Sequence, residues 1–187
     1  DDSNETNEKK KEYKGWPTYQ GDPGRNQYSS LNQIDKVNVE RLQVAWSYHT
    51  GDIRDNRSQI QCNPIIIDNI LYGTSPKIKL FALDAVTGRL LWEFDPDLDF
   101  APHPNRGVTY WRSGHDIRIF FTAGSLLFAI NADTGKPVAS FGTEGVTSLK
   151  KGLGLRSADL YVASTTPGVI YKDLLIIGTR VSEGADA

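Results

Sequence analysis

Sulfur-containing residues are nearly absent from this sequence: one of 187 residues is cysteine, Cys62, and none is methionine. A single cysteine excludes an intrachain disulfide and a zinc site built from four thiolates of this chain. Long apolar runs are also missing, since residues 64–71 are interrupted by Asp68 and Asn69 and fall short of the roughly 20 residues that span a membrane. The formal net charge is only −2, so nucleic acid is not an expected partner.

The composition is that of a globular protein that begins with a polar segment. Hydrophobic residues make up 39% of the chain, which is enough to form a core. Residues 1–14 are rich in acids and lysines and poor in apolar residues, which predicts a flexible polar tail. Two explanations of such a start are equally good: removal of a leader peptide, or an arbitrary boundary of the sequence.

Short apolar runs broken by Gly, Pro, Asn and Asp dominate the rest of the chain. The clearest are residues 64–73, 117–122, 125–130 and 168–178. In the first and last, Asp68-Asn69 and Lys172-Asp173 separate two apolar arms, which predicts β-hairpins with tight turns. The only helical signal, over residues 34–42, is short.

Two segments repeat without a gap. Residues 81–94 and 128–141 both contain Ala-x-Asp/Asn-x-x-Thr-Gly, with Thr87 and Thr134 separated by 47 residues. Trp46 precedes Trp92 by 46 residues in a similar strand context, whereas the second copy has Ala139 at this position. A period of 40 to 50 residues built from short strands is typical of β-propeller blades.

The Thr-Gly motif has a structural explanation. Gly88 can take the positive φ angle of a tight turn without a Cβ clash, and Asp84 and Thr87 can bond the exposed backbone. One large aromatic side chain per blade would fill the gap between radially splayed sheets, so Trp92 is predicted to be a packing residue rather than a ligand contact. At 46 or 47 residues a unit, the chain supplies three to four blades, and we expect further polypeptide to complete the ring.

These motifs resemble those of the pyrroloquinoline-quinone (PQQ) dependent dehydrogenases. The resemblance runs from about Gly15 to the last residue and rests on the opening segment 15–34, the two Thr-Gly repeats, Asn105-Arg-Gly-Val108 and residues 176–184. It implies an all-β fold, the N-terminal blades of an eight-bladed β-propeller over residues 15–187. It also implies a periplasmic or membrane-attached enzyme that oxidises sugars or alcohols with PQQ and calcium and passes electrons to ubiquinone or a cytochrome.

The resemblance also assigns roles to individual residues. Arg106 matches the arginine that bonds the quinone oxygens, a role suited to a planar, permanently charged donor fork. Glu183 matches a calcium ligand, since hard cations prefer carboxylate oxygen. Either Thr165 or Thr166 matches a hydroxyl that bonds a PQQ carboxylate, with an ordinary strand threonine as the alternative.

Arg180 and Ser182 are further candidate cofactor contacts because they share the segment of Glu183. An ordinary exposed strand end is the alternative interpretation of both.

Two departures from the family pattern stand out. Gln61 replaces a glutamate that faces the cofactor in many relatives, and an amide can still donate and accept hydrogen bonds. The adjacent cysteine pair of the alcohol dehydrogenases is missing; residues 100–104 stand there instead, and His103 is predicted to cover the quinone ring unless it is a solvated turn residue. This departure resembles the membrane glucose-dehydrogenase branch and favours a sugar or polyol substrate.

The resemblance implies that the catalytic aspartate and the remaining metal ligands lie beyond residue 187, so this chain alone is expected to be inactive. In that mechanism Arg106 stabilises the developing oxyanion. The alternative is a non-catalytic propeller scaffold of the outer membrane that binds protein partners and needs neither Arg106 nor Glu183.

Overall fold

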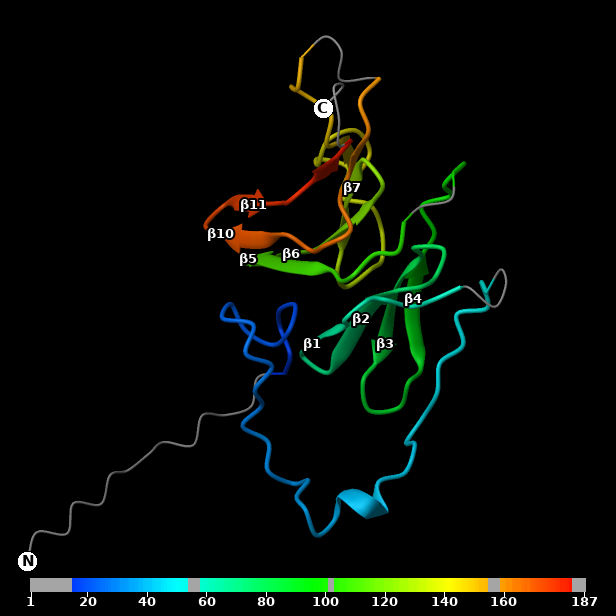
Figure 1. The fold of residues 1–187 in the computed structure, drawn as a ribbon, viewed down its shortest axis with the longest axis vertical. Helices are drawn as coiled ribbons and strands as arrows, with labels where there is room; N and C mark the ends of the chain where they lie inside the picture. The colour runs from blue at the N-terminus through cyan, green and yellow to red at the C-terminus, as the bar shows by residue number, and fades with distance from the viewer. Residues whose placement is uncertain (1–14, 54–57, 101–102, 155–158, 183–187) are drawn as a thin grey trace, which may run out of the picture.

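The computed structural model describes residues 15–53, 58–100, 103–154 and 159–182, and it is built from antiparallel β-sheets (Figure 1). The first is a four-stranded sheet in which each strand pairs with the next one along the chain. Its strands are β1 (Ile65–Ile67), β2 (Ile70–Thr74), β3 (Leu80–Asp84) and β4 (Leu90–Phe94). This order is the meander of a propeller blade.

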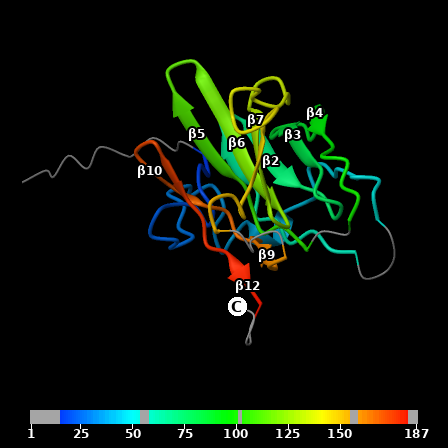
Figure 2. The same cartoon turned by 90° about the horizontal axis from the view of Figure 1, so that it is seen from above.

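A second four-stranded sheet repeats the arrangement. Its strands are β5 (Thr109–Ser113), β6 (Asp116–Ala123), β7 (Leu126–Asn131) and β8 (Val146–Ser148). The two sheets lie side by side in both views of the ribbon (Figures 1 and 2). Between them lies one apolar core, to which Ile65, Tyr72 and Leu80 contribute from one side and Ile119 and Phe121 from the other.

The third unit is only partly formed in the described residues. It contains β9 (Val162–Ala163), β10 (Val169–Tyr171), β11 (Leu174–Ile176) and β12 (Arg180–Val181). The hairpin β10–β11 lies beside β5, where the Thr109 hydroxyl donates to the carbonyl of Gly168 at 2.9 Å, and β12 pairs with β9. The all-β prediction and the incomplete propeller are confirmed. Within the described ranges, two four-stranded sheets are complete rather than three to four, because the described residues before β1 form no strand.

Both predicted hairpin turns are present. Asp68 and Asn69 have φ angles of 50° and 64°, as the tight turn between β1 and β2 requires. In the second hairpin Lys172 takes the positive φ angle, at 55°. The helical prediction over residues 34–42 is wrong except for one 3₁₀ turn at Val39–Arg41. No apolar side chain of that turn is buried, so tertiary packing gives a longer helix no support.

The repeated Thr-Gly turns are docking sites for tryptophan. The Trp92 indole N–H donates to the carbonyl of Ala132 at 3.0 Å, so a tryptophan of the first sheet binds the turn of the second. Trp46 makes the equivalent bond to the carbonyl of Ala85 at 3.2 Å. The interpretation of Trp92 as a packing residue is therefore confirmed. Its ring lies against Gly135, in the Thr-Gly turn of the next sheet.

The turns themselves form as their sequence predicts. Gly88 has a φ angle of 71°. The Asp84 carboxylate accepts the backbone N–H of Thr87 at 2.8 Å and its hydroxyl at 2.9 Å. Asn131 makes the same contacts in the second copy, both at 2.9 Å to Thr134.

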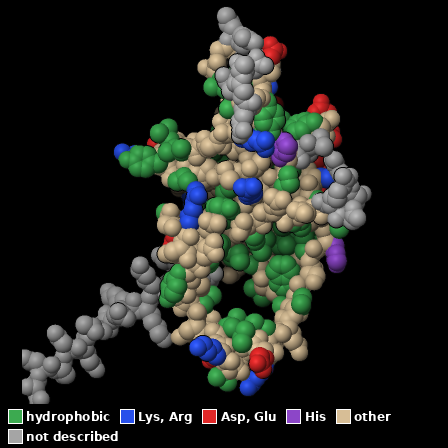
Figure 3. Space-filling model, viewed as in Figure 1, with side chains coloured by type: hydrophobic (Ala, Val, Ile, Leu, Met, Phe, Trp, Pro, Cys, Tyr) green, Lys and Arg blue, Asp and Glu red, His purple; other side chains and the backbone are tan. Residues whose placement is uncertain are grey.

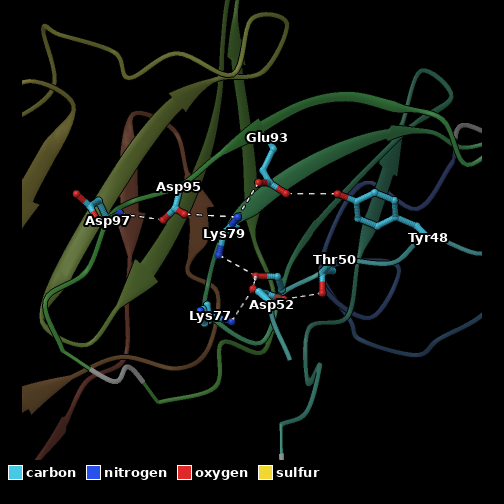
Figure 4. Close-up of polar contacts among 9 residues, drawn as sticks. Tyr48, Thr50, Asp52, Lys77, Lys79, Glu93, Asp95 and Asp97 are labelled. Atoms are coloured by element: carbon cyan, nitrogen blue, oxygen red, sulfur yellow. Dashed lines mark hydrogen bonds and ion pairs between the residues drawn. The ribbon is translucent and has the colours of Figure 1, made fainter. Parts of the chain in front are cut away.

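The segment around Trp46 does not form the predicted strand, because no strand among the described residues pairs with it. Side chains hold it instead against the first sheet (Figure 4). The Tyr48 hydroxyl donates to the Glu93 carboxylate at 3.4 Å, and Glu93 forms an ion pair with Lys79 at 3.0 Å. Nearby, the buried Asp52 carboxylate accepts hydrogen bonds from the hydroxyls of Thr50 and Ser75. The segment is thus fixed by its side chains rather than by a backbone ladder.

Apolar side chains remain exposed at both ends of this partial propeller. In the hairpin β10–β11, Tyr171 is 59% and Leu174 62% exposed. At the other end, Val37, Leu42 and Val44 of the N-terminal segment are exposed, and Figure 3 shows apolar side chains around the hollow that this segment encloses. Within the described ranges, no helix has the length and apolar character needed to cross a membrane.

Candidate functional site

The inner edges of three successive sheets run side by side and are joined by backbone hydrogen bonds. The N–H of Asn63, before β1, donates to the carbonyl of Arg106, before β5, at 3.0 Å. The N–H of Arg106 donates in turn to the carbonyl of Thr165, before β10, at 2.7 Å. Asn63 and Gly107 form a parallel bridge. Repetition of the blades thereby brings three distant segments to one place.

Asn105 holds the turn that carries Arg106. Its side chain is buried, with 3% exposed, and its amide donates to the carbonyl of Thr122 at 3.0 Å. Its side-chain oxygen accepts the N–H of Gly107 at 2.8 Å. These bonds fix the backbone on either side of Arg106, whose own side chain is exposed.

A cavity of about 340 Å³ lies at this junction. Five residues that the sequence singled out line it: Gln61, His103, Arg106, Thr165 and Arg180. Pro104, Tyr161 and Ala163 complete the lining. The structure therefore brings these five candidates together from four separate stretches of the chain; their roles toward a cofactor stay predictions.

Two other candidates, Thr166 and Ser182, are not part of this cavity. Thr166 does not line it, and its carbonyl accepts a hydrogen bond from Ser164 at 3.3 Å; of the two threonines left open by the sequence, Thr165 is the one at the cavity. Ser182 follows β12, is exposed and does not line the cavity either. Glu183, the predicted metal ligand, lies outside the described residues, as does the predicted tail over residues 1–14.

Pairing of strands and rings positions two of the lining side chains. Arg180 on β12 is the register partner of Ala163 on β9, and both residues line the cavity. His103 lies against Tyr161, edge to face, with ring centroids 6.1 Å apart. Gln61 is held by its neighbour, since its amide donates to Gln59 at 3.0 Å.

The lining is cationic and rich in hydrogen-bond donors. It includes two guanidinium groups, and none of its described residues is acidic. Two arginine forks, an amide and a hydroxyl can bind carboxylate oxygens and carbonyl oxygens, and guanidinium groups remain charged at any working pH. This donor set fits a polar ring that carries several carboxylates, as PQQ does.

Metal ligation is not assembled by the described residues. Among them, no three His, Cys, Asp or Glu side chains are grouped so that they could hold a metal ion.

The cysteine next to Gln61 is uncharged. Burial raises the pKa of the Cys62 thiol, and hydrogen bonding to Thr74 offsets part of this rise. That thiol is therefore neutral at physiological pH.

Sequence reasoning did not single out Tyr161 or Asn105 as residues of this site. Tyr161 gives no signal beyond being an aromatic residue before a short apolar pair, and only the fold places it against His103. Asn105 stands in the Asn-Arg-Gly motif, but its role as the buried anchor of the turn is visible only in its hydrogen bonds. A buried asparagine beside a functional arginine is the signal that could have pointed to it.

The sheets and the cavity define the chain as part of a β-propeller with a cation-rich cavity at the inner strand edges. Comparison with known families agrees. The family described as "PQQ: Glucose/ethanol/alcohol dehydrogenase, beta-propeller domain" matches residues 16–187, and the chain belongs to this family. The assignment made from sequence resemblance is thereby confirmed.

Several proteins with known activities are similar to this chain. An alcohol dehydrogenase (quinone), dehydrogenase subunit, of Gluconobacter oxydans is 36% identical over 90% of this chain and 21% of its own length. Quinoprotein glucose dehydrogenase of Escherichia coli is 31% identical over 88% of this chain and 23% of its own. Quinate/shikimate dehydrogenase (quinone) of Acinetobacter baylyi is 28% identical over 92% of this chain and 25% of its own length.

Solved structures show the same fold. The quinohemoprotein alcohol dehydrogenase of Comamonas testosteroni superimposes with a TM-score of 0.71, at 28% identity, over 89% of this chain and 23% of that protein. A europium-containing methanol dehydrogenase gives a TM-score of 0.68 at 24% identity, over 92% and 28%, which shows the fold alone. The chain thus spans about a quarter of the length of the curated relatives it matches.

Proposed function

We propose that this chain forms one side of the PQQ site in a dehydrogenase that oxidises an alcohol, polyol or sugar. The observation that carries the proposal is the single cavity in which Gln61, Arg106, Thr165 and Arg180 meet. Membership of the PQQ family supports the same conclusion. When bound, PQQ supplies an electrophilic quinone carbonyl that accepts a hydride from the substrate.

The residues of this chain bind and orient that group. Arg106 would present a charged donor fork to the quinone oxygens, where its positive charge would offset negative charge. Arg180 and Thr165 would hold its carboxylates, and Gln61 would offer an amide to it. Because the backbone of Arg106 is hydrogen-bonded to both neighbouring sheets, the point from which its side chain extends is fixed.

The proposal extends to parts of the enzyme that the described residues do not contain. Glu183 remains the proposed calcium ligand. The catalytic aspartate, the other metal ligands and the rest of the propeller come from further polypeptide. We assign the complete enzyme to the periplasm, with a quinone or cytochrome as electron acceptor, and the missing cysteine pair favours sugars or polyols over simple alcohols.

The test uses the full-length protein that contains this segment. After reconstitution with PQQ and calcium, PQQ retention is measured by absorbance, and dye reduction is followed with glucose, glycerol and ethanol. Turnover of at least one substrate that depends on PQQ is the expected result. A protein that retains no PQQ and reduces no dye would contradict the proposal and favour a non-catalytic scaffold.

Arg106→Ala then tests the site itself. We expect a loss of transition-state stabilisation on the order of 3 kcal/mol, seen in kcat, with the fold intact. Arg112→Ala is the matched control, because Arg112 is an exposed arginine on β5 whose side chain donates to the carbonyl of Gly114 at 3.1 Å and does not line the cavity. Unchanged turnover in Arg106→Ala would remove the assignment.

A further inference from the structure

A second cavity, of about 270 Å³, lies directly beside the first. The two share three lining residues: His103, Tyr161 and Ala163. Its other walls come from Phe100, from Gly124 and Ser125 at the turn between β6 and β7, and from Lys150 and Val162. Because the shared residues border both spaces, whatever occupies the first cavity is adjacent to whatever enters the second.

The His103–Tyr161 ring pair borders both spaces. The rings meet at 90° with centroids 6.1 Å apart, a preferred edge-to-face arrangement. Ala163, the third shared residue, has a side chain too small to form a wall. Tyr161 is therefore the largest of the three shared side chains, and its ring packs against that of His103.

The lining of the second cavity is mixed, which suits a hydroxylated carbon chain. Phe100 and Val162 provide apolar surface, whereas Ser125, Lys150 and Tyr161 provide groups that can hydrogen-bond. Phe100 packs against the turn at Gly124, where a Cβ would lie 3.1 Å from its ring. Apolar walls with a few polar groups are typical of small-molecule sites.

We propose that this second cavity is a substrate subsite, which holds the part of a polyol or sugar remote from the reacting hydroxyl. Tyr161 is then a specificity-determining residue: its ring is the partition between the two cavities and limits the length of carbon chain that can lie across them. This inference rests on the proposed function, because it needs the quinone site beside it. It gives a role to Tyr161 and to the second cavity, neither of which has one in the proposed function.

The proposal distinguishes the tyrosine ring from its hydroxyl. Tyr161→Ala removes the partition and joins the cavities, so longer substrates gain access. Tyr161→Phe keeps the ring and its packing on His103, so selectivity is retained. Tyr171→Ala is the matched control, since Tyr171 is an exposed tyrosine on β10 that lines neither cavity.

The experiment compares glycerol with sorbitol on the full-length protein loaded with PQQ and calcium. For each variant, kcat/KM is measured for both probes, and their equilibrium binding is measured by ligand-observed NMR. We expect Tyr161→Ala to raise the sorbitol-to-glycerol ratio of kcat/KM at least fivefold. Tyr161→Phe and Tyr171→Ala should stay within twofold of the unmodified protein.

A second variant covers the case in which Tyr161→Ala fails to fold. Ser125 lines only the second cavity, so Ser125→Phe fills that space without altering the partition. We expect it to weaken sorbitol binding at least fivefold and to leave glycerol within twofold.

The outcomes separate this inference from the proposed function. If the protein retains no PQQ by absorbance, the proposed function fails. If PQQ is retained but Ser125→Phe affects both probes equally, or neither probe binds, only the subsite is overturned. An equal shift in Tyr161→Phe and Tyr161→Ala would assign the effect to the hydroxyl and overturn the partition.

Discussion

The backbone N–H of Arg106 donates to the carbonyl of Thr165 at 2.7 Å, across the boundary between the second sheet and the third. Both residues also line the candidate cofactor cavity. A bond that holds two blades together therefore also sets the distance between two proposed cofactor contacts. Blade packing and site geometry are linked at this point of the fold.

The buried amide of Asn105 provides the first prediction. We expect Asn105→Ala to cost about 1 to 3 kcal/mol of stability, because the carbonyl of Thr122 and the N–H of Gly107 lose their partner. We also expect weaker PQQ retention in the full-length protein, since the turn that carries Arg106 is no longer fixed. Chemical unfolding measures the first effect and quinone absorbance the second.

The control for this prediction is Asn26→Ala, which removes an exposed asparagine that bonds the backbone of Tyr28 in a loop. It should leave PQQ retention unchanged. Equal PQQ retention in the Asn105 and Asn26 variants would show that the turn positions Arg106 without Asn105.

Gly135 tests the docking of tryptophan between sheets. A Cβ at this position would lie 2.7 Å from the indole of Trp92, and the φ angle of 68° already disfavours a side chain. We expect Gly135→Ala to destabilise the protein by several kcal/mol, because the ring must leave its place. Urea unfolding of the full-length protein provides the measurement.

Gly114→Ala is the matched control for the backbone strain alone. Gly114 has a φ angle of 59°, yet an added Cβ would meet nothing within 4 Å. It should therefore cost about 1 to 2 kcal/mol, the penalty of a left-handed conformation. If both alanine variants lose the same stability, the indole contact contributes nothing and the docking interpretation is wrong.

Asp52 gives a pH-dependent prediction. Burial by itself would raise its pKa, but hydrogen bonds from Ser75, Thr50 and the backbone of Lys77 outweigh this effect and hold the pKa of Asp52 below its ordinary value. A lowered pKa in the folded state means that the carboxylate stabilises the fold above the unfolded pKa of about 3.9. That contribution is lost as the pH falls through the lower folded pKa.

We therefore expect Asp52→Asn to cost about 1 to 3 kcal/mol at pH 7 and less as the pH falls below about 4. Urea unfolding of both proteins at pH 7 and at pH 3 measures the difference in stability. Asp99→Asn, at an exposed position, is the control and should cost little stability at pH 7. A cost for Asp52→Asn that stays constant down to pH 3 would mean that the charge does not contribute.

Local features of this protein followed from sequence because they depend on neighbouring residues. The turns at Asp68-Asn69 and at the Thr-Gly motifs form from bonds within a few positions, such as Asp84 to Thr87. The 47-residue spacing of these turns indicated the repeating sheets. The resemblance to a known family added Arg106 and its companions, which no local pattern identifies as cofactor contacts.

Other features depend on which blades pack together. The sequence around Trp46 resembles a strand, but it forms none because strand structure needs a paired neighbour. That Trp92 binds the turn of the following sheet is likewise a contact between units.

The cavity was decided by tertiary structure. Thr165 lies close to Arg106 because the inner edges of successive sheets are hydrogen-bonded. Arg180 lies at the cavity because β12 pairs with β9. Tyr161 is remote in sequence from His103, and only the fold places the two rings in contact. The amino-acid order alone thus determined the repeating units and their turns, since these form from short-range bonds. Packing of the units around one another decided which side chains share the site, because that depends on contacts between distant segments.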